Sequence, residues 1–139
     1  MIWTRTLHVL AAIWVSTGVF ASALVFSGVK RTEEGPLRAY GLRLGQRLTT
    51  VYTVPGLLLA GALGFYQVTA AGYGFGPGWV KVSALLYLVL LVLVLFIQVP
   101  ALRKAVEGGG ALPPAVAMLT HVDALLIVVL ALLMGLKPF

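Results

Sequence analysis

Long runs of apolar residues alternate with short polar segments along this chain. Four runs are long enough to cross a bilayer, because an α-helix needs roughly 20 apolar residues to span a hydrocarbon core about 30 Å thick. They cover residues 7–29, 48–70, 79–101 and 115–136. Backbone groups in lipid must be hydrogen-bonded within their own segment, so these runs predict transmembrane helices.

The composition agrees with lipid as the solvent. Of the 139 residues, 60% are hydrophobic and 10% are charged, which is too little polar surface for a soluble domain of this size. We therefore expect an all-α, integral membrane four-helix transmembrane bundle that forms one domain, 1–139. The chain has no cysteine, which excludes disulfides, thiolate metal sites and catalytic thiols. It also lacks a phosphate-binding glycine motif, a nucleophile elbow and a nucleic-acid-binding face.

The basic residues indicate an orientation. The connections 30–47 and 102–114 lie on one side of a four-span protein and hold seven of the ten Lys and Arg residues. The positive-inside rule places these loops in the cytoplasm and both termini outside, for a protein of the inner (plasma) membrane. The remaining connection, 71–78, is uncharged and glycine-rich, and it predicts a tight turn.

The first run also contains Ala21-Ser22-Ala23, which has the form of a signal-peptide cleavage site. The apolar run continues past this site, so we interpret the run as a retained span. In the second run, Gly56, Ala60 and Gly64 form a stripe of small residues suited to close helix packing. Pro55 and Pro100 predict kinks that either are tolerated near the interface or shape a ligand site.

Four ionisable residues lie within or at the ends of the spans, where such groups mark functional sites by default. His8 is either an interfacial histidine or a ligand of a b-type haem. Lys81 follows Trp79, and this pair is typical of an interfacial anchor. His121 lies deeper in its span, about 9 Å from the end at 1.5 Å per residue, so we expect it to have a specific partner. Asp123 points to a different helix face, and Arg47 or a buried hydroxyl is its expected partner.

Height along the bundle decides which of these groups can cooperate. His8 and Lys81 both lie near the outer face, whereas His121 lies roughly 13–20 Å lower. A bis-histidine haem needs both ligands at one level, so a pair of His8 and His121 is disfavoured. His8 and Lys81 are the better pair.

The order of short motifs resembles a known family. Leu7-His8-Val9 is followed by Trp14, the second span opens with Arg47-Leu48-Thr49-Thr50, and the third opens with Gly78-Trp79-Val80-Lys81. This order resembles the HemJ-type protoporphyrinogen oxidases and the related CopD-like copper-resistance proteins, over nearly the whole chain. The resemblance implies a haem b cofactor, oxidation of protoporphyrinogen, and essential roles for His8 and Lys81. The third span has no histidine and the fourth has Thr120-His121-Val122-Asp123 where the family carries Asn-Glu-x-Pro, which indicates a divergent member.

Three hypotheses follow. In the first, the chain binds haem or porphyrin, with His8 as axial ligand, Lys81 as second ligand or counter-charge, and His121 with Asp123 in a separate polar site such as a proton route. In the second, the chain is a non-enzymatic subunit or a CopD-like metal-handling protein, in which Met118 and His121 share a helix face as copper ligands. In the third, Asp123 and the other polar residues specify packing in a homo-oligomer.

Overall fold

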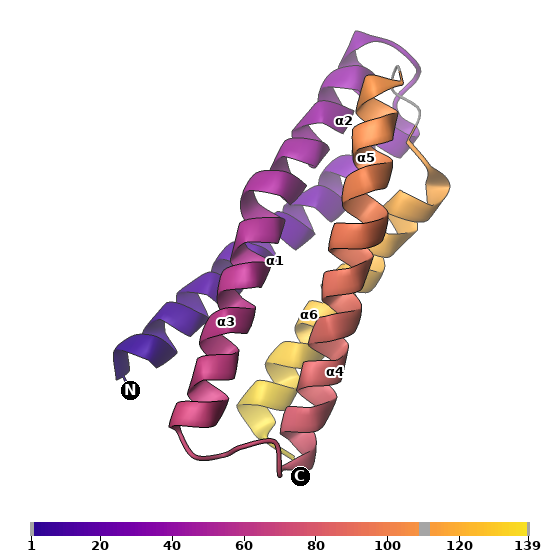
Figure 1. The fold of residues 1–139 in the computed structure, drawn as a ribbon. Helices are drawn as coiled ribbons and strands as arrows, with labels where there is room; N and C mark the ends of the chain where they lie inside the picture. Colours follow the sequence, from indigo (N-terminus) through magenta and orange to yellow (C-terminus); the bar gives the residue numbers. More distant parts are fainter. Residues whose placement is uncertain (1, 109–111, 139) are drawn as a thin grey trace.

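The computed structural model describes residues 2–108 and 112–138, and it forms a bundle of long helices (Figure 1). Its elements are α1 (Ile2–Arg31), α2 (Pro36–Leu48), η1 (Thr49–Thr53), α3 (Val54–Ala70), α4 (Gly78–Val92), η2 (Leu93–Gln98), α5 (Val99–Glu107) and α6 (Pro114–Leu136). The π-helical segments η1 and η2 join their neighbours without a break, so the chain makes four rods. Each rod is long and apolar enough to cross a membrane. The predicted all-α fold with four spans is confirmed.

The rods extend beyond the apolar runs at one end of the bundle. Residues 36–47 were expected in a connection, but they form most of α2, and α5 continues to Glu107. At 1.5 Å per residue, the 35-residue rod from Pro36 to Ala70 is about 52 Å long, well beyond the roughly 30 Å of hydrocarbon. An apolar run marks only the part of a helix that lies in lipid, and a helix can continue into water.

Both π-helical segments end two residues before a proline. Pro55 follows η1, and Pro100 follows η2. Proline has no N–H to donate and its ring crowds the carbonyl four residues earlier, so an α-helix must rearrange there. The rearrangement here is a wider turn, in which the Val54 N–H donates to the Thr49 carbonyl and the Val99 N–H to the Val94 carbonyl. The two prolines therefore lead to π-helical turns within continuous rods.

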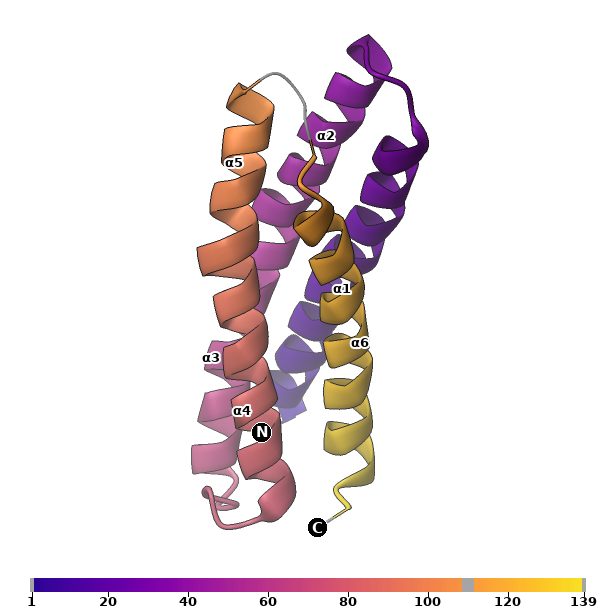
Figure 2. The same ribbon diagram turned by 90° about the vertical axis from the view of Figure 1, so that its right-hand side faces the viewer.

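The helices pack unevenly around α1, as Figures 1 and 2 show. This helix packs against α2, η1 and α3 on one side and against α6 on the other, while α4 packs against α6. Glycine permits a close crossing of α1 and α3, because a Cβ on Gly56 would lie 2.9 Å from the Val15 backbone nitrogen. In contrast, α3 and α4 are neighbours in sequence but make little contact.

Two apolar clusters fill the interior. The basic-end cluster is built around Phe26 and includes Val29, Leu42, Leu102, Ala105, Leu112, Val116 and Ala117. The cavity-end cluster consists of Val15, Val19, Leu57, Leu90, Val94 and Leu130. Between them lie buried polar side chains from all four rods, which we call the polar layer: Ser22, Thr49, Thr53, Gln98, Thr120 and Asp123.

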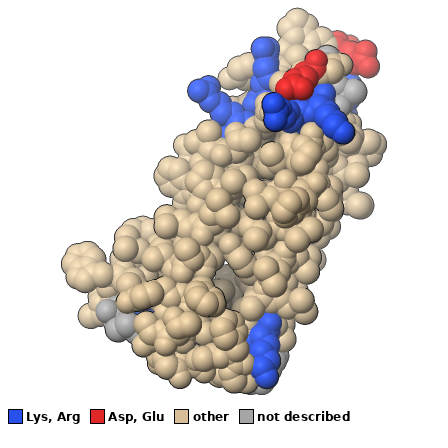
Figure 3. Space-filling view, viewed as in Figure 1, with Lys and Arg blue, Asp and Glu red and all other residues tan. Residues whose placement is uncertain are grey.

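Charge separates the two ends of the bundle. Figure 3 shows most Lys and Arg side chains gathered at the end where α2 and α5 lie, which we call the basic end. Both termini lie toward the opposite, terminal end (Figure 2). The glycine-rich turn also lies at the terminal end and contains Gly72 and Gly74, whose φ values of 74° and 59° are disfavoured for residues with a Cβ. The basic connections therefore share one end of the bundle and the termini share the other, as in any four-span arrangement.

The close contact of α1 with η1 predicts a stability effect. A Cβ on Gly18 would lie 2.5 Å from Thr53 Oγ1 and 2.7 Å from its backbone nitrogen. Gly18→Ala should therefore overpack this crossing and lower the free energy of unfolding by about 1–3 kcal/mol. Gly28→Ala is the matched control, because nothing lies within 4 Å of its Cβ position. Denaturation followed by circular dichroism in detergent measures both, and equal stability of the two variants would contradict the packing.

The orientation is tested directly because the chain has no cysteine. Glu33→Cys lies in the connection at the basic end, and Gly76→Cys lies in the turn at the terminal end; both positions are exposed. In intact cells, a membrane-impermeant maleimide should label Gly76→Cys and spare Glu33→Cys until the membrane is opened. The reverse pattern would mean that the basic end faces outward.

Candidate functional site

The structure places His8 in a cavity near the terminal end. The side chain is half-buried on α1; its Nδ1 atom is buried without a hydrogen bond, and the backbone of Ala60 on α3 is a polar group that interacts with the ring. Its ring packs against α3 at Gly64, where a Cβ would lie 3.0 Å from the ring carbon Cε1. Gly64 therefore provides the space that the imidazole occupies, which gives this glycine of the predicted stripe a specific role.

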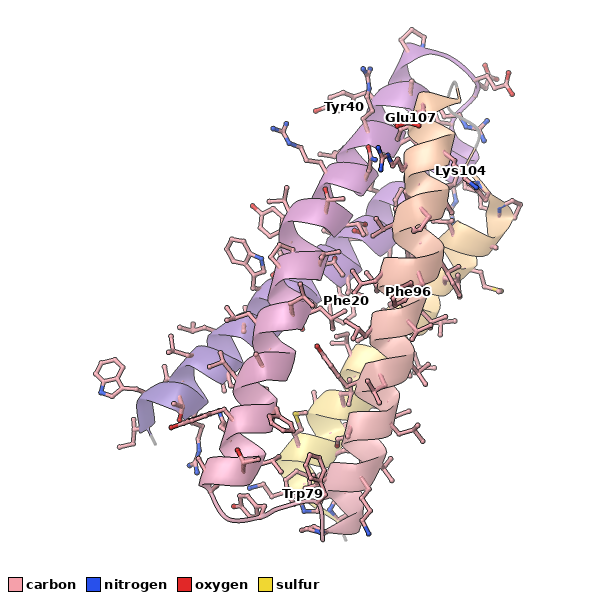
Figure 4. All side chains as sticks on the ribbon, viewed as in Figure 1. Phe20, Tyr40, Trp79, Phe96, Lys104 and Glu107 are labelled. Atoms are coloured by element: carbon pink, nitrogen blue, oxygen red, sulfur yellow. The ribbon has the colours of Figure 1, made fainter. Side chains whose placement is uncertain are left out.

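The cavity has a volume of about 420 Å³, within the roughly 300–1,000 Å³ typical of small-molecule sites. Helices α1, α3, α4 and α6 all contribute to its lining, which is almost entirely apolar. Phe65, Phe75 and Trp79 supply aromatic surface, and Figure 4 shows Trp79 at the terminal end of the bundle. A recess is visible between α3 and α4 on the face seen in Figure 3. The cavity exists because these two helices make so little contact.

Few polar atoms reach the cavity. The Tyr87 hydroxyl donates to the Leu57 carbonyl at 2.8 Å, so α4 is tied to α3 at this point. The Ser16 hydroxyl donates to the carbonyl of Ala12 within its own helix at 2.6 Å. Ser83 is buried and its hydroxyl has no partner. The sequence analysis missed Ser83 and Tyr87, although their spacing of four residues places them on one helix face.

Lys81 does not join His8 in the cavity. It is exposed on α4, whereas its neighbours Val80, Ser83 and Ala84 line the cavity. Another cation lies nearer to the cavity wall: Lys137 Nζ is 5.6 Å from the centre of the Trp79 ring and 5.1 Å from that of Tyr73. The structure therefore gives the terminal end two lysines, one facing outward and one against an aromatic pair.

His121 has hydrogen-bond partners for both ring nitrogens. Nδ1 lies 2.8 Å from the Ala117 carbonyl, which can only accept, so this nitrogen carries the proton. Nε2 lies 3.5 Å from the hydroxyl of Ser27 on α1. Met118, the proposed second copper ligand, is 63% exposed. Among the described residues, no three His, Cys, Asp or Glu side chains gather where they could share a metal ion.

Asp123 lies in the polar layer and is only 2% exposed. Its Oδ2 atom accepts a hydrogen bond from Gln98 Nε2 at 2.5 Å, whereas Oδ1 is buried without a partner. Arg47, one of the partners expected from the sequence, is exposed. The partner that the structure shows is an amide, which the sequence analysis missed because Gln98 lies on a different span.

This pairing predicts non-additive effects on stability. Gln98→Leu should leave a buried carboxyl oxygen without its donor and cost about 1–3 kcal/mol of unfolding free energy. Adding Asp123→Leu removes the oxygen itself and should recover much of this loss. Denaturation of both single variants and the double variant in detergent measures the coupling. Additive losses would show that the two side chains do not interact.

Comparison with known proteins gives one finding. No curated protein and no solved structure gives a significant match. One family model covers residues 2–138, and its description is "Predicted integral membrane protein (DUF2269)". That description agrees with the four spans and names neither a cofactor nor a reaction. Since the match covers nearly the whole chain, the protein belongs to this family of integral membrane proteins.

Proposed function

We propose that the protein binds haem b or a related porphyrin in the cavity among α1, α3, α4 and α6. The observation that carries the proposal is His8, a histidine on the wall of an apolar cavity with an unpartnered ring nitrogen. Imidazole is the usual protein ligand of haem iron, and a porphyrin needs a largely apolar, aromatic-lined site. The resemblance to HemJ-type proteins rests on short motifs in three spans, and it implies an essential role for the same histidine.

The other residues around the cavity fit this ligand class. Met134 on α6 also lines the cavity and is a second side chain able to ligate haem iron. Lys81 and Lys137 lie toward the terminal end, where they would serve as counter-charges to the carboxylates of a porphyrin. Since Lys81 is exposed, we assign it this role and not that of an axial ligand.

The weak contact between α3 and α4 provides a route for such a ligand. A porphyrin is apolar enough to dissolve in the bilayer, and the recess between these helices faces the side of the bundle that lipid covers (Figure 3). The ligand would then enter sideways from the membrane. A bound haem would supply one-electron redox chemistry, and a bound porphyrinogen would be the substrate of an oxidase.

Haem binding by His8 has a spectroscopic test. Purified protein titrated with haemin should give a Soret band, with α and β bands after reduction by dithionite. His8→Ala should remove the ligand and weaken haemin binding by about tenfold or more, the loss typical when a metal site is disturbed. His121→Ala is the matched control, because it removes the other histidine, which lies outside the cavity.

A second pair of variants tests the cavity itself, independently of the iron ligand His8. Ala84→Phe should fill the cavity from α4 and block both haemin and metal-free protoporphyrin, while Ala70→Phe, at an exposed position, should block neither. Equal spectra for wild type and His8→Ala would contradict the role of His8. If neither probe binds to the wild type, the alternative of a non-enzymatic membrane subunit or metal-handling protein takes the place of this proposal. Porphyrinogen oxidation by the loaded protein distinguishes an enzyme from a haem carrier.

A further inference from the structure

The polar layer contains a carboxyl group that is enclosed by protein. Asp123 lies between the two apolar clusters, which seal it from the basic end and from the cavity. The cavity-end cluster, including Leu57 and Leu90, separates it from the porphyrin site proposed above. Each of the four rods contributes at least one buried polar side chain at this level. The layer is therefore a second polar site, independent of the cavity.

Two oxygen atoms in this layer have no hydrogen-bond partner, Asp123 Oδ1 and Thr53 Oγ1. Most threonine hydroxyls in the bundle donate to a carbonyl three or four residues earlier: Thr6, Thr17, Thr32, Thr49, Thr50, Thr69 and Thr120. Thr53 is the last residue of η1, and the carbonyl four residues before it, that of Thr49, accepts the backbone N–H of Val54. The Thr53 hydroxyl therefore forms no hydrogen bond within its own helix, although the side chain is only 3% exposed.

No cationic side chain neutralises Asp123. Within residues 2–108 and 112–138, the one ion pair closer than 4 Å joins Arg103 and Glu107. The helices packed against α6 are α1 and the rod of α4 and η2, and η2 has no ionisable side chain. The ionisable groups of α1, α4 and α6 itself are exposed, line the cavity or have other partners: Arg5, His8, Lys30, Arg31, Lys81, Tyr87 and His121. A bare carboxylate in such a place is costly, so a cation must accompany it.

We propose that Asp123 is a binding site for a small monovalent cation, a proton or a sodium ion, in the middle of the membrane. Either ion neutralises the negative charge of the carboxylate, and a sodium ion would also give Oδ1 a direct contact. π-helical turns inside α-helices occur frequently at functional sites, and η2 is the segment that brings Gln98 to Asp123 in this layer. A single carboxylate without further acidic neighbours suits a monovalent ion better than a divalent one.

Infrared spectroscopy tests this site with little ambiguity. The chain has four acidic residues, and the other three, Glu33, Glu34 and Glu107, are exposed. Full-length protein in vesicles at neutral pH, in sodium-free choline chloride, should show the C=O band of a protonated carboxylic acid. Asp123→Asn should remove this band, and the control Glu107→Gln should leave it unchanged. If sodium is the ligand, sodium chloride should replace the band with those of a carboxylate; if the ligand is the proton alone, the band should persist.

Gln98→Ala keeps the carboxyl group but removes its donor, so it should shift the band without removing it. This variant keeps the experiment informative if Asp123→Asn fails to fold. The proposal is overturned if wild-type protein shows no protonated carboxyl in sodium-free buffer, or if its band is unaffected by both Asp123→Asn and Gln98→Ala. Haemin binding is measured on the same samples, so failure of the cation site and failure of the porphyrin site are separate results.

Discussion

The structure depends on one constraint: inside a bilayer, the protein must supply the hydrogen-bond partners of its own polar groups. The backbone meets this constraint by forming helices along nearly all of the chain, even where prolines require a wider turn. Most hydroxyl groups meet it by bonding to their own helix. The few buried polar atoms without a hydrogen bond are therefore informative: the described residues contain five, and all but Arg38 Nε on α2 lie at two levels. His8 and Ser83 lie in the cavity, and Thr53 and Asp123 lie in the polar layer.

Much of the fold could be predicted from the sequence because apolar length is a direct physical requirement for crossing lipid. The four spans follow from that requirement, and the turn between the second and third spans follows from the glycines of residues 71–78. The extension of α2 beyond the lipid could not be predicted in the same way, since residues 36–47 are polar and a polar segment is compatible with a helix or a loop. The π-helical turns were also missed, because a proline indicates that a helix is disturbed but not how it rearranges.

The candidate site was predicted in part. The sequence identified His8 and Asp123 as unusual because ionisable groups are rare in spans, and the structure shows Asp123 buried and His8 half-buried. Height along the bundle placed His8 and Lys81 at one end, which the structure agrees with. Height says nothing about rotation around a helix axis, however, and rotation puts Lys81 outside and Ser83 inside. Some partners lie on other rods, as Gln98 does for Asp123 and Gly64 for His8. Such contacts depend on how distant segments of the chain pack together, and local sequence patterns do not show this.

The positions of η1 and η2 have a mechanical consequence. The two rods that contain them are each weakened at the polar layer, because a π-helical turn next to a proline lacks the regular hydrogen bonds that make an α-helix stiff. On the cavity side of this level, α3 and α4 are held together mainly by the bond from Tyr87 to Leu57, while the basic-end cluster holds the other halves of the rods. We therefore expect bending to be concentrated at the height of the polar layer, where it would separate α3 from α4 at the terminal end and leave the basic end packed.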